Sequence, residues 1–190
     1  MGDHVQNINS FEELLGDSRR RTADLASVFL LEHPEHFDEA LNIALSDKPA
    51  TSMRAARVVQ LASGEDPGLL IGHTKRIIDL LPELKEQGAQ RSLIKAMIPI
   101  VGKLDEEELG PLAQTCFNWL EDSSTPPAIY VYSLEIIYGI SNLNPDMKSE
   151  LVSFLQLRKD ERSPGIKSKS AAILKKLHKE IIGKNIQISG

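Results

Sequence analysis

The sequence predicts an all-α fold in which antiparallel helical hairpins stack in a repeated array. A pattern of small and aliphatic residues recurs about every 37–39 residues between Pro49 and Lys179. Within each unit, apolar residues are spaced three and four apart, which indicates amphipathic helices. No segment shows the sustained apolar–polar alternation that a strand would need, so no sheet is predicted. Because a single helical hairpin cannot bury its apolar face, this period indicates stacked hairpins.

The repeat is visible in both helices of each unit. In the first helices, Ala55, Val59 and Ala62 align with Leu93, Met97 and Ile100. In the second helices, Leu70, Ile77, Ile78 and Leu81 align with Leu109, Cys116, Phe117 and Leu120. This register predicts that Ile94 and Ile98 are buried between consecutive hairpins and that Cys116 is a small core residue.

The chain begins with elements that repeat poorly. Residues 1–9 predict a leader, and Ser10 begins a short helix that ends at Gly16. Apolar residues in 25–30 and 37–45 then predict a first hairpin, which is atypical because a terminal repeat exposes one face to water. We expect one repeat domain over residues 1–190, with a loose tail at 183–190.

From Pro49 onward, helix starts are marked by a capping residue followed by proline. The side-chain oxygen accepts hydrogen bonds from free N–H groups, and proline at the first helical position loses none. The pairs are Asp66-Pro67, Thr125-Pro126, Asn144-Pro145 and Ser163-Pro164. Pro99 falls inside a helical pattern and predicts a kink, whereas Pro111 lies close enough to a helix start to be tolerated.

The bulk composition is that of a globular protein. Hydrophobic residues make up 41% and charged residues 26% of the 190 residues, with a net charge of −5. The single cysteine excludes an intramolecular disulfide framework and favours a reducing compartment. The N-terminus lacks signal-peptide features, and no apolar run approaches the ~18 residues of a membrane span. We therefore expect a cytoplasmic protein without a membrane contact.

The sequence carries no recognisable catalytic, cofactor or metal motif. Residues 64–68 lack the lysine of a phosphate-binding loop, and neither a zinc-protease helix motif nor a nucleophile elbow is present. His33 and His36 resemble a ligand pair, but Pro34 bends the chain between them, which favours a polar turn. We therefore predict a non-catalytic protein with no cofactor. An enzyme with an unrecognisable site remains an alternative.

Segments 49–59 (PATSMRAARVV) and 163–174 (SPGIKSKSAAIL) resemble the first-helix signature of HEAT-type repeats. The resemblance covers about residues 49–180 and implies a right-handed superhelix of HEAT-like hairpins within the HEAT and armadillo-like superfamily. Such a fold implies a protein-binding adaptor or scaffold whose second helices line a concave face. The candidate contact residues there are His73, Arg76, Gln114, Asn118 and Trp119. Trp119 either anchors a partner or fills a gap between repeats.

Charge is distributed unevenly along the chain. From Arg158 to Gly190 the chain carries nine Lys or Arg residues and three acids, a net of 9 − 3 = +6. The remainder carries 13 bases and 24 acids, a net of 13 − 24 = −11. A basic end can bind phosphate backbones, so a nucleic-acid-binding solenoid is the alternative to a protein-binding adaptor. A solvated terminal repeat explains the same lysines.

Overall fold

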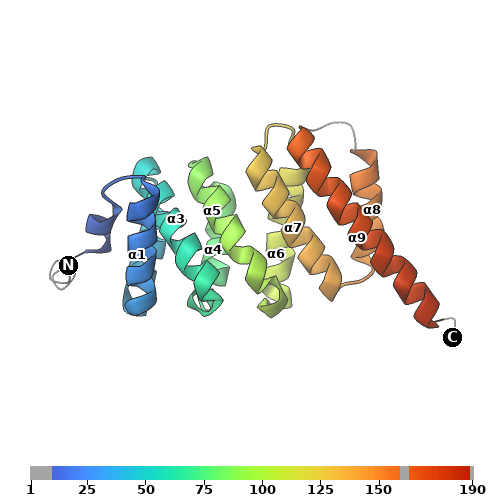
Figure 1. The fold of residues 1–190 in the computed structure, drawn as a ribbon, viewed down its shortest axis with the longest axis horizontal. Helices are drawn as coiled ribbons and strands as arrows, with labels where there is room; N and C mark the ends of the chain where they lie inside the picture. Colours follow the sequence, from blue (N-terminus) through green and yellow to red (C-terminus); the bar gives the residue numbers. More distant parts are fainter. Residues whose placement is uncertain (1–9, 159–162, 189–190) are drawn as a thin grey trace. The chain divides into compact units, whose positions relative to one another are not determined.

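The computed structural model describes residues 10–158 and 163–188. Within these ranges every regular element is a helix and there is no strand, which confirms the predicted all-α array of helical hairpins (Figure 1). The expected leader, residues 1–9, lies outside the described residues. The chain divides into two compact units, Met1–Ile100 and Val101–Gly190, and each is described by itself. The handedness of the predicted superhelix stays a prediction.

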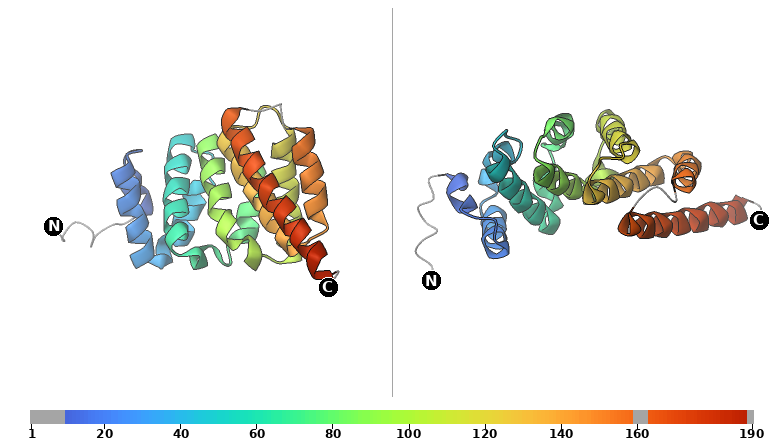
Figure 2. Two further views of the ribbon diagram at one scale, coloured as in Figure 1. Left: turned by 45° about the vertical axis from the view of Figure 1, so that its right-hand side comes forward. Right: turned by 90° about the horizontal axis from the view of Figure 1, so that it is seen from above.

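The first unit is built around α3 (Pro49–Glu65), which packs against three other helices. These are α1 (Arg20–Glu32), α2 (Phe37–Ala44) and α5 (Gln87–Met97). In Figure 2, α1, α3 and α5 form one layer of the unit, and α2 and α4 (Thr74–Leu80) form a second layer beside it. Short 3₁₀ helices complete the unit: η1 (Phe11–Leu15), η2 (Pro34–His36), η3 (Pro67–Leu70) and η4 (Leu81–Glu83).

The second unit is built around α7 (Pro127–Leu143). This helix packs against α6 (Glu106–Glu121), α8 (Met147–Leu157) and α9 (Pro164–Ile188), and α8 also contacts α9. Most buried side chains of α7 are aliphatic or aromatic, namely Ile129, Tyr130, Leu134, Ile136, Ile137 and Ile140, and Ser133 and Ser141 are buried with them. Helix α7 therefore forms the core of this unit, as α3 does in the first.

The predicted helix starts are confirmed at some positions and wrong at others. Helix α9 begins at Pro164, as predicted, and the Asp66 carboxylate accepts a hydrogen bond from the Gly68 N–H. Helix α7 begins at Pro127 rather than Pro126, because the residue before a proline is forced out of the helical region. Helix α8 begins at Met147, after a turn that contains Asn144 and Pro145.

The register and kink predictions have mixed outcomes. Ile94 is fully buried, as predicted, but Ile98 is only half-buried. The difference arises because α5 ends at Met97 and continues as the 3₁₀ helix η5 (Ile98–Lys103). Pro99 therefore ends the α-helix instead of kinking it, since its nitrogen cannot donate the next helical hydrogen bond. Pro111 is accommodated inside α6, as predicted.

Helix α9 corrects the prediction of a loose tail. The helix continues through Gly183 to Ile188, and only residues 189–190 of the predicted tail lie outside the described residues. Gly183 lowers helix propensity by roughly 1 kcal/mol relative to alanine, which is too little by itself to end a long helix. No proline follows it to stop the helix.

Arginine side chains link successive hairpins within each unit. In the first unit, Arg54 Nη1 donates hydrogen bonds to the carbonyls of Leu15 and Gly16 at 3.0 and 3.2 Å. In the second unit, Arg158 Nη1 donates to the carbonyls of Leu120 and Glu121 at 3.2 and 3.3 Å. In each case a cation satisfies carbonyls that a helix end leaves without partners.

Candidate partner-binding surfaces

The two predicted contact residues of the first unit are engaged within the protein. His73 lies at the start of α4, and its ring centroid is 5.5 Å from that of Phe37. Arg76 Nη2 lies 2.9 Å from Asp38 Oδ1, and Arg76 Nη1 donates a hydrogen bond to Asn42 Oδ1 at 3.0 Å. The Arg76 side chain is only 34% exposed. These residues therefore join α4 to α2, which gives them a structural role in addition to any contact with a partner.

The predicted contact residues of the second unit lie on α6. Gln114 Nε2 donates a hydrogen bond to Asn118 Oδ1 at 2.9 Å, and both side chains are exposed. Pro111 and Glu121 are also exposed and extend the same stripe at spacings of three and four residues. Trp119 is half-buried beside this stripe. The predicted alignment of Arg76 with Asn118 along one face stays a prediction, because the two residues belong to different units.

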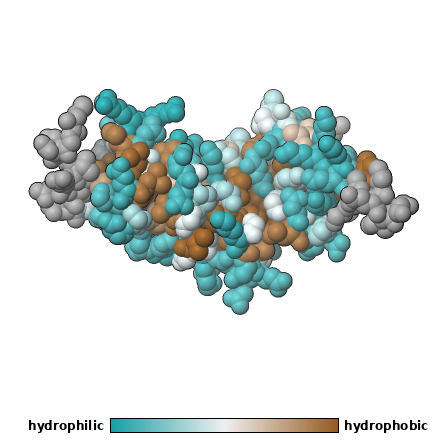
Figure 3. All heavy atoms as spheres, turned by 60° about the horizontal axis from the view of Figure 1, so that its bottom comes forward, coloured by the Kyte–Doolittle hydropathy of each residue, from teal (hydrophilic) through white to brown (hydrophobic). Residues whose placement is uncertain are grey.

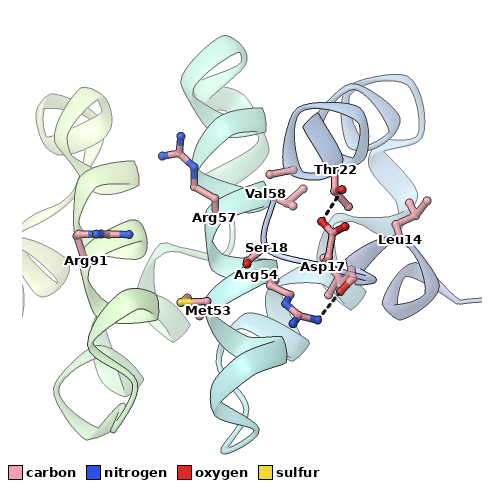
Figure 4. Close-up of a pocket in the computed structure, with 11 residues that line it drawn as sticks. Leu14, Asp17, Ser18, Thr22, Met53, Arg54, Arg57, Val58 and Arg91 are labelled. Atoms are coloured by element: carbon pink, nitrogen blue, oxygen red, sulfur yellow. Dashed lines mark hydrogen bonds between the residues drawn. The ribbon is translucent and has the colours of Figure 1, made fainter. Parts of the chain in front are cut away.

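The first unit also contains a pocket that the sequence analysis did not predict (Figure 4). Its volume is about 220 Å³. Elements η1, α1, α3 and α5 and the η1–α1 loop supply its lining residues: Leu14, Leu15, Asp17, Ser18, Thr22, Ala23, Met53, Arg54, Arg57, Val58 and Arg91. Apolar and charged side chains thus line the same pocket.

Three arginines and one aspartate set the charge of this pocket. Arg54 and Arg57 lie three residues apart on α3, and Arg91 extends from α5 (Figure 4). Asp17 accepts hydrogen bonds from Thr22 Oγ1 at 2.7 Å and from the Arg19 N–H at 2.8 Å. These bonds, that of Thr22 above all, lower the pKa of Asp17, so its carboxylate is ionised at neutral pH. The four groups therefore carry a net charge of 3 − 1 = +2.

A sequence signal for part of this pocket exists in the repeat register. Arg91 occupies the position 38 residues after Met53, so the two residues are equivalent in consecutive first helices. Because α5 packs on α3, this register brings Arg91 to the same pocket as Arg54 and Arg57. The wall formed by residues 14–18 could not be found in this way, because the N-terminal segment does not follow the repeat.

His36 contacts Glu39, the residue that attaches η1 to α2, whereas His33 packs on Phe29. His36 Nδ1 lies 3.1 Å from Glu39 Oε2, and Glu39 Oε1 accepts hydrogen bonds from Ser10 Oγ at 3.0 Å and from the Phe11 N–H at 2.9 Å. The ring of His33 lies 4.6 Å from that of Phe29. Over residues 10–158 and 163–188, no group of three or more His, Cys, Asp or Glu side chains is arranged to hold a metal ion.

Cys116 is fully buried, as predicted for a core residue. Burial away from water raises the pKa of its thiol to about 12, because the charged thiolate loses its hydration. At neutral pH the side chain is therefore a neutral thiol. Because the thiolate is the reactive form, this environment makes Cys116 a poor nucleophile.

Several cations of the basic C-terminal region are engaged within the second unit. Lys148 and Lys169 form ion pairs with Glu180 and Glu135, respectively. Lys176 Nζ lies 5.6 Å from the centroid of the Tyr138 ring. The exposed lysines of α9 that the structure describes include Lys167, Lys175 and Lys179. Lys159 and Arg162 lie outside the described residues, as does the side chain of Lys184.

Exposed large apolar side chains come from many elements. They are Leu25, Val28, Ile71, Leu80, Leu143, Leu157 and Ile182. On the face drawn in Figure 3, hydrophobic areas are interspersed with hydrophilic groups. Apolar surface alone therefore does not single out a docking site among the side chains that the structure describes. Across those same residues, no helix combines the length and the apolar character that crossing a membrane requires.

Comparison with known proteins agrees with this architecture. A search of curated proteins and a search of solved structures gave no match. The family model described as HEAT repeat domain matches residues 12–177, which is most of the chain. Proteins of this kind are helical repeat proteins that commonly mediate protein interactions. The continuous match and the stacked helical hairpins show that the chain belongs to the HEAT repeat domain family.

Proposed function

We propose that this chain is a non-catalytic adaptor that binds a protein partner through the exposed side of α6. The observation that supports this site is the stripe of Pro111, Gln114, Asn118 and Glu121, with Trp119 half-buried beside it. Two amide side chains offer donors and acceptors to a partner, and an adjacent tryptophan supplies apolar contact area. Family membership supports the protein-binding role, because helical repeats present equivalent positions as an extended binding surface.

The amide pair suits recognition of another polypeptide. Gln114 and Asn118 hydrogen-bond to each other in the structure, and each retains further hydrogen-bonding atoms. A partner can use these atoms without a buried charge having to be desolvated. Trp119 already has part of its surface covered, so a partner would complete its burial at a low cost in side-chain entropy.

The test compares two double variants in partner capture and then in titration with the purified partner. Gln114→Arg with Asn118→Arg places two bulky cations on the α6 stripe, and we expect loss of the partner that the unmodified protein captures. Lys175→Glu with Lys179→Glu changes two exposed side chains of α9 at the same spacing, and we expect it to retain that partner. Circular dichroism checks that both variants are folded.

The opposite result would favour the nucleic-acid alternative. If the α6 variant binds normally and the α9 variant does not, the functional surface is the basic C-terminal region. Binding of duplex DNA that weakens steeply with salt would then identify contacts to phosphates.

A further inference from the structure

We infer that the pocket formed by η1, α1, α3 and α5 binds an acidic segment of a partner protein, one in which Asp or Glu stands next to an apolar side chain. This inference concerns a surface of the first unit and does not depend on the α6 surface proposed above. It rests on the pairing state of three arginines, on the size and lining of the pocket, and on the charge of the surrounding unit.

The three arginines of this pocket form no ion pair with a carboxylate among the described residues, whereas five of the other eight Lys and Arg residues of the first unit do. Among the described residues, no Asp or Glu oxygen forms an ion pair with the guanidinium of Arg54, Arg57 or Arg91. By contrast, Arg20, Lys48, Lys75 and Arg76 each pair with an acid. Asp17 is the one acid that lines the pocket, and Arg54 helps to lower its pKa. One carboxylate among three arginines leaves a local positive potential that an incoming carboxylate can neutralise.

The three guanidinium groups have different neighbours and therefore different roles. Arg54 is partly committed, because its Nη1 donates to the carbonyls of Leu15 and Gly16. Arg57 donates to Gln60 Oε1 at 2.7 Å, which leaves its other N–H groups for a ligand. Arg91 is exposed. Arg57 and Arg91 are thus the groups best placed to bind a carboxylate, and the planar arginine fork suits its two oxygens.

The size and lining of the pocket favour amino-acid side chains over a larger ligand. A volume of about 220 Å³ is below the roughly 300–1,000 Å³ of sites that enclose a drug-sized molecule. Leu14, Met53 and Val58 provide an apolar wall next to the arginines. Met53 can adapt its flexible side chain to the shape of an apolar guest. This combination predicts an apolar residue in the hollow and an acidic neighbour at Arg57 and Arg91.

The charge of the unit argues against a polyanion. Residues 1–100 contain 11 Lys or Arg and 15 Asp or Glu, a net of 11 − 15 = −4. A nucleic acid binds through many phosphates over an extended basic surface, which an acidic unit opposes. A short acidic segment meets the arginines locally, because salt screens more distant charges beyond roughly 8–10 Å. The ionised Asp17 in the wall also disfavours a phosphate dianion more than a single carboxylate.

The experiment selects ligands from a random heptapeptide library with the unmodified protein. We expect enriched peptides to carry Asp or Glu adjacent to Leu, Ile, Met or Phe. Arg57→Gln with Arg91→Gln removes two charges while keeping hydrogen-bonding side chains of similar helix propensity. We expect the affinity of the enriched peptides to fall at least about tenfold, as the loss of charge-assisted hydrogen bonds requires.

Matched controls distinguish an effect of the pocket arginines from an effect of the protein's net charge. Lys75→Gln with Lys85→Gln removes the same net charge at two exposed positions of the same unit outside the pocket, so peptide affinity should stay within about twofold. Peptides whose acidic residues are replaced by Gln or Asn should bind as weakly to the unmodified protein as the acidic peptides bind to the arginine variant. Should the double variant fail to fold, the exposed Arg91→Gln alone provides the comparison.

Three results would overturn the inference. The first is enrichment of peptides without acidic residues, and the second is equal binding of acidic peptides by the unmodified protein and the arginine variant. The third is competition by inorganic phosphate that depends on Arg57 and Arg91 and is stronger than competition by acetate, which would assign the pocket to a phosphorylated ligand. Normal peptide binding in the α6 variant would show that the two surfaces act separately.

Discussion

Replacing Ile94 by alanine tests the repeat register in the first unit. The Ile94 side chain is 0% exposed and lies on α5, which packs against α3. The substitution removes three carbon groups, worth about 2.4 kcal/mol at about 0.8 kcal/mol each. The cavity that remains adds to this, so we expect the free energy of unfolding to fall by about 2–5 kcal/mol. Urea unfolding followed by far-UV circular dichroism measures the loss.

The control for Ile94 is a second isoleucine of the same unit. Ile71 is 61% exposed, so Ile71→Ala should change stability by less than about 0.5 kcal/mol. A loss of less than about 0.5 kcal/mol for Ile94→Ala would refute the register. Fluorescence adds a second measurement, because the single tryptophan and all three tyrosines lie after residue 100. If Ile94→Ala shifts the unfolding midpoint reported by Trp119, the two units unfold together.

Three further predictions concern the second unit. The Cys116 thiol should react with a disulfide reagent at about pH 8 only as fast as the unit opens, and rapid reaction in the folded state would contradict its burial. Hydrogen bonds from Lys148 and Tyr138 hold the pKa of Glu180 below its ordinary value of 4.5, so Glu180→Gln should destabilise the protein by on the order of 1 kcal/mol at pH 7. Because the pKa of Glu180 is lower in the folded state, its carboxylate stabilises the fold at pH values above 4.5. The stability difference between the two proteins should therefore disappear as pH falls through the folded-state pKa. An equal difference at pH 7 and below that pKa would rule out a contribution from the charged pair. Arg158→Met should cost about 1–2 kcal/mol in denaturation followed by Trp119 fluorescence, whereas the exposed Lys175→Met should cost less than about 0.5 kcal/mol; equal effects would show that the carbonyl contacts contribute nothing.

The repeat period correctly predicted which helical positions are buried. Positions such as Ala55, Ile94 and Cys116 are fully buried because the stacking of amphipathic helices leaves them no other environment. Helix ends were predicted less well. At residues 126 and 127 two successive prolines compete for the first helical position, and capping rules alone do not show that the second begins the helix.

The sequence predicted the helices themselves better than the close contacts between them. Gly88 is in the first turn of α5, where a Cβ atom would lie 2.6 Å from Met53 Cγ. In the sequence it is one more weak helix former. In the structure it allows α5 to approach Met53, which also lines the arginine pocket. Such a role depends on a neighbour 35 residues away, and propensity rules do not include it.

The arginines differ in the groups that each guanidinium contacts. Arg158 meets free carbonyls at the end of α6, and Arg76 meets Asp38 and Asn42, so both are engaged in linking hairpins. Arg91 occupies the repeat position that holds Met53 in the preceding first helix, and it meets no such acid or helix end among the described residues. Arg91 therefore places a charge at the position where the preceding repeat has an apolar side chain. No ion pair among the described residues neutralises its charge, and the acidic segment inferred above would supply one.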